Sequence, residues 1–69
     1  MENKVRARRK ARGMKQDDLA FRIGVAQSTL SGIERGTQIP GVDIAIRIAK
    51  VLKCSVEDVF IESNEWINR

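Results

Sequence analysis

Hydrophobic positions in the first half of the chain follow the spacing of two short helices separated by a turn. Leu19, Ala20 and Ile23 fall at i, i+1 and i+4, and after Gly24 an apolar stripe at helical spacing begins again with Leu30. Such spacing is typical of helices that bury one face. Glycine adopts positive φ without steric cost, so the second helix is expected to leave the turn at a steep angle.

The same pattern extended along the chain predicts a compact, all-α fold of five helices. We expect these helices at residues 4–12, 16–24, 27–35, 42 or 43 to 52, and 56–60. Gly13, Gly24 and Gly36 are expected to end the first three, and Ser55 with Asp58 resembles a capping box at the start of the last. The 42–52 segment is rich in β-branched residues, which would also suit a strand, but its 3-4 spacing favours a helix. Residues 61–69 fit a short strand, a half-turn or a frayed end.

Length and composition limit the kind of protein. The 69 residues suit one domain spanning 1–69, without an apolar run long enough to cross a membrane. The charged N-terminus is unlike a signal peptide, so we expect a cytoplasmic protein. Cys54 is the single cysteine and histidine is absent, which argues against a disulfide or a zinc site. We expect no cofactor or metal, and interpret Cys54 as a packing spacer rather than a redox switch.

Charge is unevenly distributed along the chain. The formal net charge is +4, with basic residues crowded near the start and acidic ones near the end. A basic side predicts attraction to a polyanion such as nucleic acid. Charge alone, however, more often marks a solvated helix face, so the decision depends on the motif.

The motif resembles a known family. The resemblance is carried by the string Gln16-x-x-Leu19-Ala20-x-x-Ile23-Gly24-Val25-x-Gln27-Ser28-Thr29-Leu30-Ser31-x-Ile33-Glu34-Arg35-Gly36, followed by Pro40 and Ile48-Ala49-x-x-Leu52. It is similar to the helix-turn-helix domain of phage-repressor-like (XRE/Cro-C1 type) regulators and of restriction-modification controller proteins, over about residues 4–60. The resemblance implies a lambda-repressor-like fold, with the motif at about 16–35 and helix 27–35 in the major groove of double-stranded DNA.

The resemblance also implies roles for particular residues. Gln16 would bind a phosphate and brace Gln27, and base edges would be contacted by Gln27, Ser28, Ser31 and Gly32. Thr29 lies between core and groove and is a weaker candidate. Arg35, Thr37 and Gln38 would hold the DNA backbone. The structural alternatives are that Ser28 caps its helix and that Gly32 permits close packing.

Arg9 and Glu34 match a family ion pair that joins the first helix to the third, which is a structural rather than a DNA-binding role. Two positions depart from the family pattern. Arg8 stands where an aliphatic residue is usual, and Lys15 stands where a Ser or Thr cap is frequent. The second departure removes a cap worth about 1 kcal/mol.

One helix in one groove binds weakly, so the resemblance implies a homodimer on a palindromic operator. The interface candidates are the apolar residues left over from the core: Ile44, Val56, Val59, Ile61, Trp66 and Ile67. The tail at 61–69 is thus a possible dimerisation element, with Trp66 either an interface anchor or a lid on the core.

We therefore expect a sequence-specific transcriptional regulator, most simply a repressor, of bacterial or phage origin. A chain without His or Tyr and with one Cys offers little for catalysis, so no enzyme is expected. Two alternatives remain: an antitoxin or other partner-dependent interaction module on the same fold, and a nonspecific nucleoid or RNA-binding protein. The first of these alternatives implies an unknown protein partner.

Overall fold

The computed structural model describes residues 3–60, which form five helices and no strand. The helices are α1 (Val5–Ala11), α2 (Gln16–Ile23), α3 (Gln27–Arg35), α4 (Val42–Leu52) and α5 (Val56–Val59). The predicted all-α fold is confirmed, and each predicted boundary lies within one residue of the observed one. The prediction for 61–69 lies outside the described residues.

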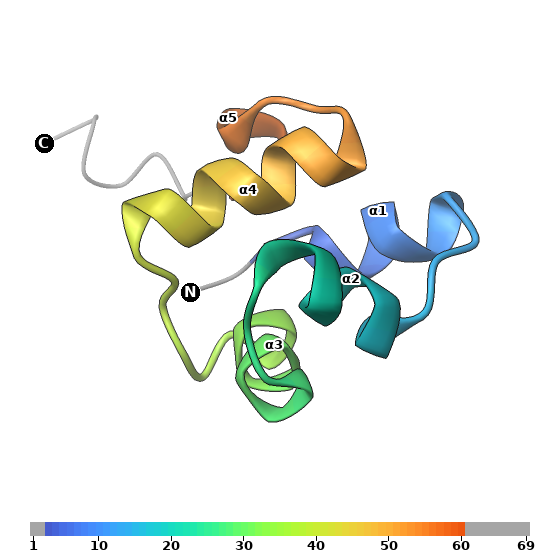
Figure 1. Cartoon of the computed structure of the whole chain (residues 1–69). Coiled ribbons are helices and arrows are strands. Elements are labelled where there is room, and N and C mark those ends of the chain that lie inside the picture. The colour runs from blue at the N-terminus through green and yellow to red at the C-terminus, as the bar shows by residue number, and fades with distance from the viewer. Residues whose placement is uncertain (1–2, 61–69) are drawn as a thin grey trace, which may run out of the picture.

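The helices pack around one apolar core. α2 contacts both α3 and α4, α1 contacts the same two helices, and α5 packs on α4. Figure 1 shows α4 running across the upper part of the molecule with α5 above it, while α3 lies at the bottom, seen almost along its axis. The residues that fill the core are Val5, Leu19, Ala20, Ile23, Leu30, Ile33, Ile48, Leu52 and Val59. This packing leaves one long side of α3 uncovered.

Burial of Val59 corrects one expectation. Apolar spacing assigns this side chain to a dimer interface, but it is fully buried within the core. Its backbone carbonyl also accepts a 2.7 Å hydrogen bond from the Lys4 N–H, which ties α5 to the start of α1. Val59 therefore stabilises the monomer and is not available to a second copy.

Left-handed residues end three of the helices. Gly24 (φ 77°) follows α2 and Gly36 (φ 80°) follows α3, as the sequence predicts. Lys53 ends α4 with φ 56° and is the one non-glycine residue at positive φ among residues 3–60. Nothing in the sequence pattern marks Lys53 as a left-handed cap.

The start of α5 confirms the predicted capping box. The Asp58 N–H donates to Ser55 Oγ at 3.1 Å, and the Ser55 N–H donates to the Asp58 carboxylate at 3.3 Å. Hydrogen bonds from the Ser55 side chain, and secondarily from its backbone, hold the pKa of Asp58 below its ordinary value of 3.8. α2 and α3 begin without a side-chain cap, at Lys15 and Ala26.

Within residues 3–60, none of the helices combines the length and apolarity that a bilayer crossing requires.

Candidate nucleic-acid interface

The uncovered side of α3 carries short polar groups. Gln27 and Ser28 are exposed at its first turn, and Ser31 and Thr29 are half-buried. Because Ala26 is the N-cap residue, Ser28 lies inside the helix and does not cap it, so that structural alternative is wrong. The first turn of α3 is thus free to approach another molecule.

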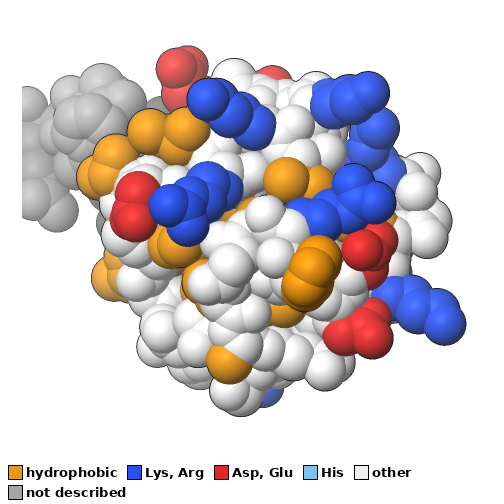
Figure 2. Space-filling view, in the orientation of Figure 1, with side chains coloured by type: hydrophobic (Ala, Val, Ile, Leu, Met, Phe, Trp, Pro, Cys, Tyr) orange, Lys and Arg blue, Asp and Glu red, His pale blue; other side chains and the backbone are white. Residues whose placement is uncertain are grey.

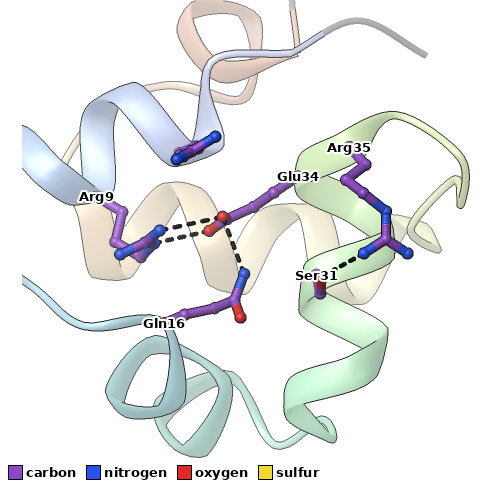
Figure 3. A pocket seen from close by; sticks show the side chains of 6 residues that line it. Arg9, Gln16, Ser31, Glu34 and Arg35 are labelled. Atoms are coloured by element: carbon purple, nitrogen blue, oxygen red, sulfur yellow. Dashed lines mark hydrogen bonds and ion pairs between the residues drawn. The ribbon is translucent and has the colours of Figure 1, made fainter.

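A polar network behind α3 sets its orientation. Arg9 Nε donates to Glu34 Oε2 at 2.7 Å and Arg9 Nη2 donates to Oε1 at 3.1 Å, so the expected ion pair is present in a bidentate form. The two side chains are only 10% and 4% exposed. Arg9 Nη1 also donates to the Met14 carbonyl at 2.9 Å. Figure 3 shows Arg9 and Gln16 pointing at Glu34 from two different helices.

Gln16 extends this network to the exposed end of α3. Its Nε2 donates to Glu34 Oε1 at 3.1 Å, and its Oε1 accepts from Gln27 Nε2 at 3.3 Å. Gln27 keeps one amide hydrogen and its carbonyl oxygen for a further partner. The contact between Gln16 and Gln27 has the form that the family resemblance implies, and it fixes which way the Gln27 amide faces.

An open cleft of about 390 Å³ lies beside this network, between α1 and α3. It is lined by Arg6, Arg9, Gln16, Ser31, Glu34 and Arg35. Arg35 Nη1 donates to Ser31 Oγ at 2.6 Å, which orients the guanidinium over the cleft (Figure 3). Ser31 therefore faces the cleft and is already bonded to Arg35. Because Ser31 Oγ is the acceptor in this bond, its O–H remains a donor, and the expected contact with a base edge stays a prediction.

Arg6 is a cleft residue that sequence reasoning treats only as general positive charge. It lies three positions before Arg9 on α1, so both side chains emerge on neighbouring parts of one helix face. This spacing is the sequence signal that could have identified Arg6. Because Arg9 pairs with Glu34 of α3, a residue three positions before Arg9 on the same helix also faces α3.

The loop after α3 folds back on the helix. The N–H groups of Thr37 and Gln38 donate to the Gly32 carbonyl at 3.0 and 3.2 Å, and Thr37 Oγ1 donates to the same oxygen at 3.2 Å. These two backbone N–H groups are thus engaged within the protein. Gly32 is buried beneath the loop, as the close-packing alternative predicts.

Few charged side chains lie over α3 on the face of the molecule that Figure 2 shows. Figure 2 shows Lys and Arg side chains gathered in the upper part of the view, whereas the surface at the bottom, over α3, is mostly neutral polar groups and backbone. The cleft beside α3 provides Arg6 and Arg35, and such cations can meet the phosphates of a polyanion while neutral groups contact its interior.

The interface candidates for a dimer are spread over different environments. Ile44 is half-buried against the core, Val56 is exposed, and Ile61, Trp66 and Ile67 lie outside the described residues. Sequence reasoning misses three exposed apolar residues around the start of α4: Ile39, Val42 and Ile46. Their exposure depends on which side of α4 faces the core.

Two helices joined by a glycine turn, with the second exposed and braced from behind, define a helix-turn-helix DNA-binding domain. Comparison with known proteins agrees: a family model described as helix-turn-helix matches residues 5–59. An uncharacterised HTH-type transcriptional regulator of Methanocaldococcus jannaschii is 35% identical over 65 residues, covering 94% of this chain and 98% of that protein.

Solved structures show the same similarity. The restriction-modification controller protein C.AhdI of Aeromonas hydrophila superposes with a TM-score of 0.75 and 30% identity, over 81% of this chain and 85% of that one. The P22 c2 repressor in complex with a synthetic operator gives 0.74 and 32%, over 77% and 80%. The chain therefore belongs to the helix-turn-helix family of DNA-binding transcription regulators, of the XRE/Cro-C1 type.

Proposed function

We propose that this protein represses transcription by binding a palindromic DNA operator as a homodimer, with α3 in the major groove. The observation that carries the proposal is the network running from Arg9 through Glu34 and Gln16 to Gln27. It holds α3 rigidly from behind and orients one glutamine amide at the exposed first turn. A glutamine amide pairs with the N6 and N7 atoms of adenine in the major groove.

Phosphates would be held on either side of α3. Arg6 and Arg35 flank the cleft, and within residues 3–60 the side chain of Arg6 makes no hydrogen bond or ion pair. Guanidinium groups bind phosphate oxygens strongly, and such contacts set the position of the protein on the duplex. Gln16, at the first position of α2, adds an amide beside a helix N-terminus, which favours anions. The Thr37 hydroxyl already donates to the Gly32 carbonyl, so Thr37 supplies no further donor to a phosphate.

A second copy of the chain would cover the apolar residues at the start of α4. Val42 is 78% exposed, with Ile39 and Ile46 exposed beside it. A two-fold axis places the same patch of each copy against the other, which is how symmetric dimers bury such surfaces. The Val42→Asp variant should then sediment as a monomer, and the Phe21→Asp variant, altered at an exposed apolar residue of α2, should not. Residues 61–69, including Trp66, are a further candidate for this contact.

Selection of bound sequences from a random duplex library near physiological salt tests the proposal. Wild type should recover a palindrome with half-sites about one helical turn apart. Gln27→Ala should weaken the preference at one position of each half-site, by about 1 to 3 kcal/mol if it removes a bidentate pairing. Lys50→Ala, an exposed change on α4, serves as the control and should recover the wild-type sequence. Salt-sensitive binding without any recovered motif would contradict the proposal.

A further inference from the structure

Gly32 has no side chain of its own, and the side chain of Gln38 covers the surface of α3 at this position. A Cβ atom placed on Gly32 would lie 3.0 Å from Oε1 of Gln38 and 3.3 Å from its Cβ. Contacts that short are not tolerated without movement. The side chain of Gln38 therefore lies directly over the helix surface that Gly32 leaves bare.

The loop fixes this arrangement. The Gln38 N–H and the Thr37 N–H both donate to the Gly32 carbonyl, and the Thr37 hydroxyl bonds to the same oxygen. Three hydrogen bonds thus attach the loop to one residue of α3. The backbone of Gln38 is therefore held in a fixed position next to α3.

The position is on the side of α3 that approaches DNA. Gly32 follows Ser28 by four residues, so the two lie on the same helix face. It follows Gln27 by five residues, which is ~7.5 Å along the helix axis and about two base-pair steps. A side chain that packs over Gly32 would therefore contact a different base pair from the one that Gln27 contacts.

The chemistry of Gln38 suits a base edge. The residue is exposed, and among residues 3–60 its side-chain amide has no hydrogen-bond partner. A neutral amide offers a donor and an acceptor side by side, which matches the N7 and N6 groups of adenine, whereas phosphates are met most strongly by cations. Arg6 and Arg35 already supply such cations beside α3.

We propose that Gln38 is a specificity-determining residue. Its side chain packs over Gly32, and from there its amide contacts a base edge in the major groove. This replaces the sequence-based expectation that Gln38 holds the DNA backbone and that Gly32 itself lies against a base. The inference rests on the proposed function, since it requires α3 to bind in the major groove.

The test is the same library selection carried out with wild type, Gln38→Ala, Gly32→Ala and the double variant. Gln38→Ala should lose at least about fivefold of preference at one base pair of each half-site and keep the rest of the motif. Gly32→Ala should weaken the same preference, because its new Cβ would force the Gln38 amide to shift by a few tenths of an ångström. The nearest atom is the end of a flexible side chain, so the fold is expected to persist, as circular dichroism would verify. The double variant should match Gln38→Ala.

Gly41→Ala is a matched control. Its Cβ would also meet a side-chain oxygen at 3.0 Å, but that oxygen belongs to Asp43. This variant should recover the full wild-type motif.

Each other outcome overturns the inference in a recognisable way. A Gln38→Ala motif identical to wild type, with affinity reduced equally on all sequences, would make Gln38 a backbone contact and leave the proposed function intact. If Gly32→Ala recovers the wild-type motif while Gln38→Ala does not, then Gly32 is not needed to position the Gln38 side chain. Absence of any motif for wild type would overturn the inference together with the proposed function.

Discussion

At the scale of single residues, Glu34 accepts three side-chain hydrogen bonds that join α3 to α1 and α2. It accepts from two nitrogens of Arg9 and from the Gln16 amide, and its side chain is almost fully buried. The stability of such a group depends on its partners being present, because an isolated charge away from water is costly. Without Glu34, the Arg9 guanidinium would retain only the Met14 carbonyl among these partners.

Glu34→Ala should accordingly lower the free energy of unfolding by about 3 to 5 kcal/mol. Urea denaturation followed by circular dichroism measures the loss. The control is Asp18→Ala, which breaks an exposed ion pair, formed with Arg22 at 3.2 Å between side chains that are 46% and 56% exposed. Exposed pairs contribute about 0 to 1 kcal/mol, so a comparable loss in the two variants would contradict the assignment of Glu34 as a buried structural residue.

At the scale of the elements, the helix ends show how far the sequence determines the fold. Gly24 and Gly36 end α2 and α3 because glycine adopts the left-handed conformation cheaply, and α3 has the predicted bounds. The end of α4 uses Lys53 in the same conformation at a steric cost. No local pattern in the sequence reveals that cost.

Lys53→Gly should therefore raise the free energy of unfolding by about 0.5 to 1 kcal/mol, since glycine relieves the left-handed strain at the helix end. Lys50→Gly provides the comparison: the same change inside α4 should lower it by about 1 kcal/mol. Thermal unfolding of both variants beside wild type gives the two signs. Equal destabilisation by both would show that Lys53 makes favourable contacts that outweigh its backbone strain.

The candidate site is predictable where it depends on helix periodicity and not where it depends on how segments meet. Gln16 and Gln27 are placed by their positions at two helix starts, and they contact each other as the resemblance implies. The packing of Gln38 over Gly32 depends on the path of the loop after α3, and residue spacing does not determine that path. Sequence reasoning misplaces Val59 for a related reason: in a helix as short as α5, apolar spacing does not decide which face is buried.

At the scale of the whole molecule, the excess of positive charge should govern affinity. The net charge of +4 includes Arg6 and Arg35, which line the cleft beside α3. Neutralising a phosphate releases a counterion, so affinity for duplex DNA falls with salt in proportion to the number of phosphates that the protein neutralises.

Arg6→Gln and Arg35→Gln should each weaken binding to specific and random duplexes by similar factors. Each should reduce the slope of log affinity against log salt by about 0.9 for every phosphate that the variant no longer neutralises. Lys50→Gln carries the same charge change on α4, on the opposite side of the molecule from α3 in Figure 1. If all three variants change the slope equally, the effect comes from overall charge and not from phosphates bound at the cleft.

The close approach of Gly32 and Gln38 has a consequence for how this domain diverges from its relatives. A side chain at position 32 and a long side chain seated at position 38 compete for one volume, because even a single Cβ comes within 3.0 Å of the glutamine. In an alignment of related sequences the two positions should therefore covary: those with a large residue at 32 should carry a small one at 38, and those with glycine at 32 should tolerate a long one. Operator preference would then change by exchanging the residue that fills this volume, while the buried pair of Arg9 and Glu34 stays untouched.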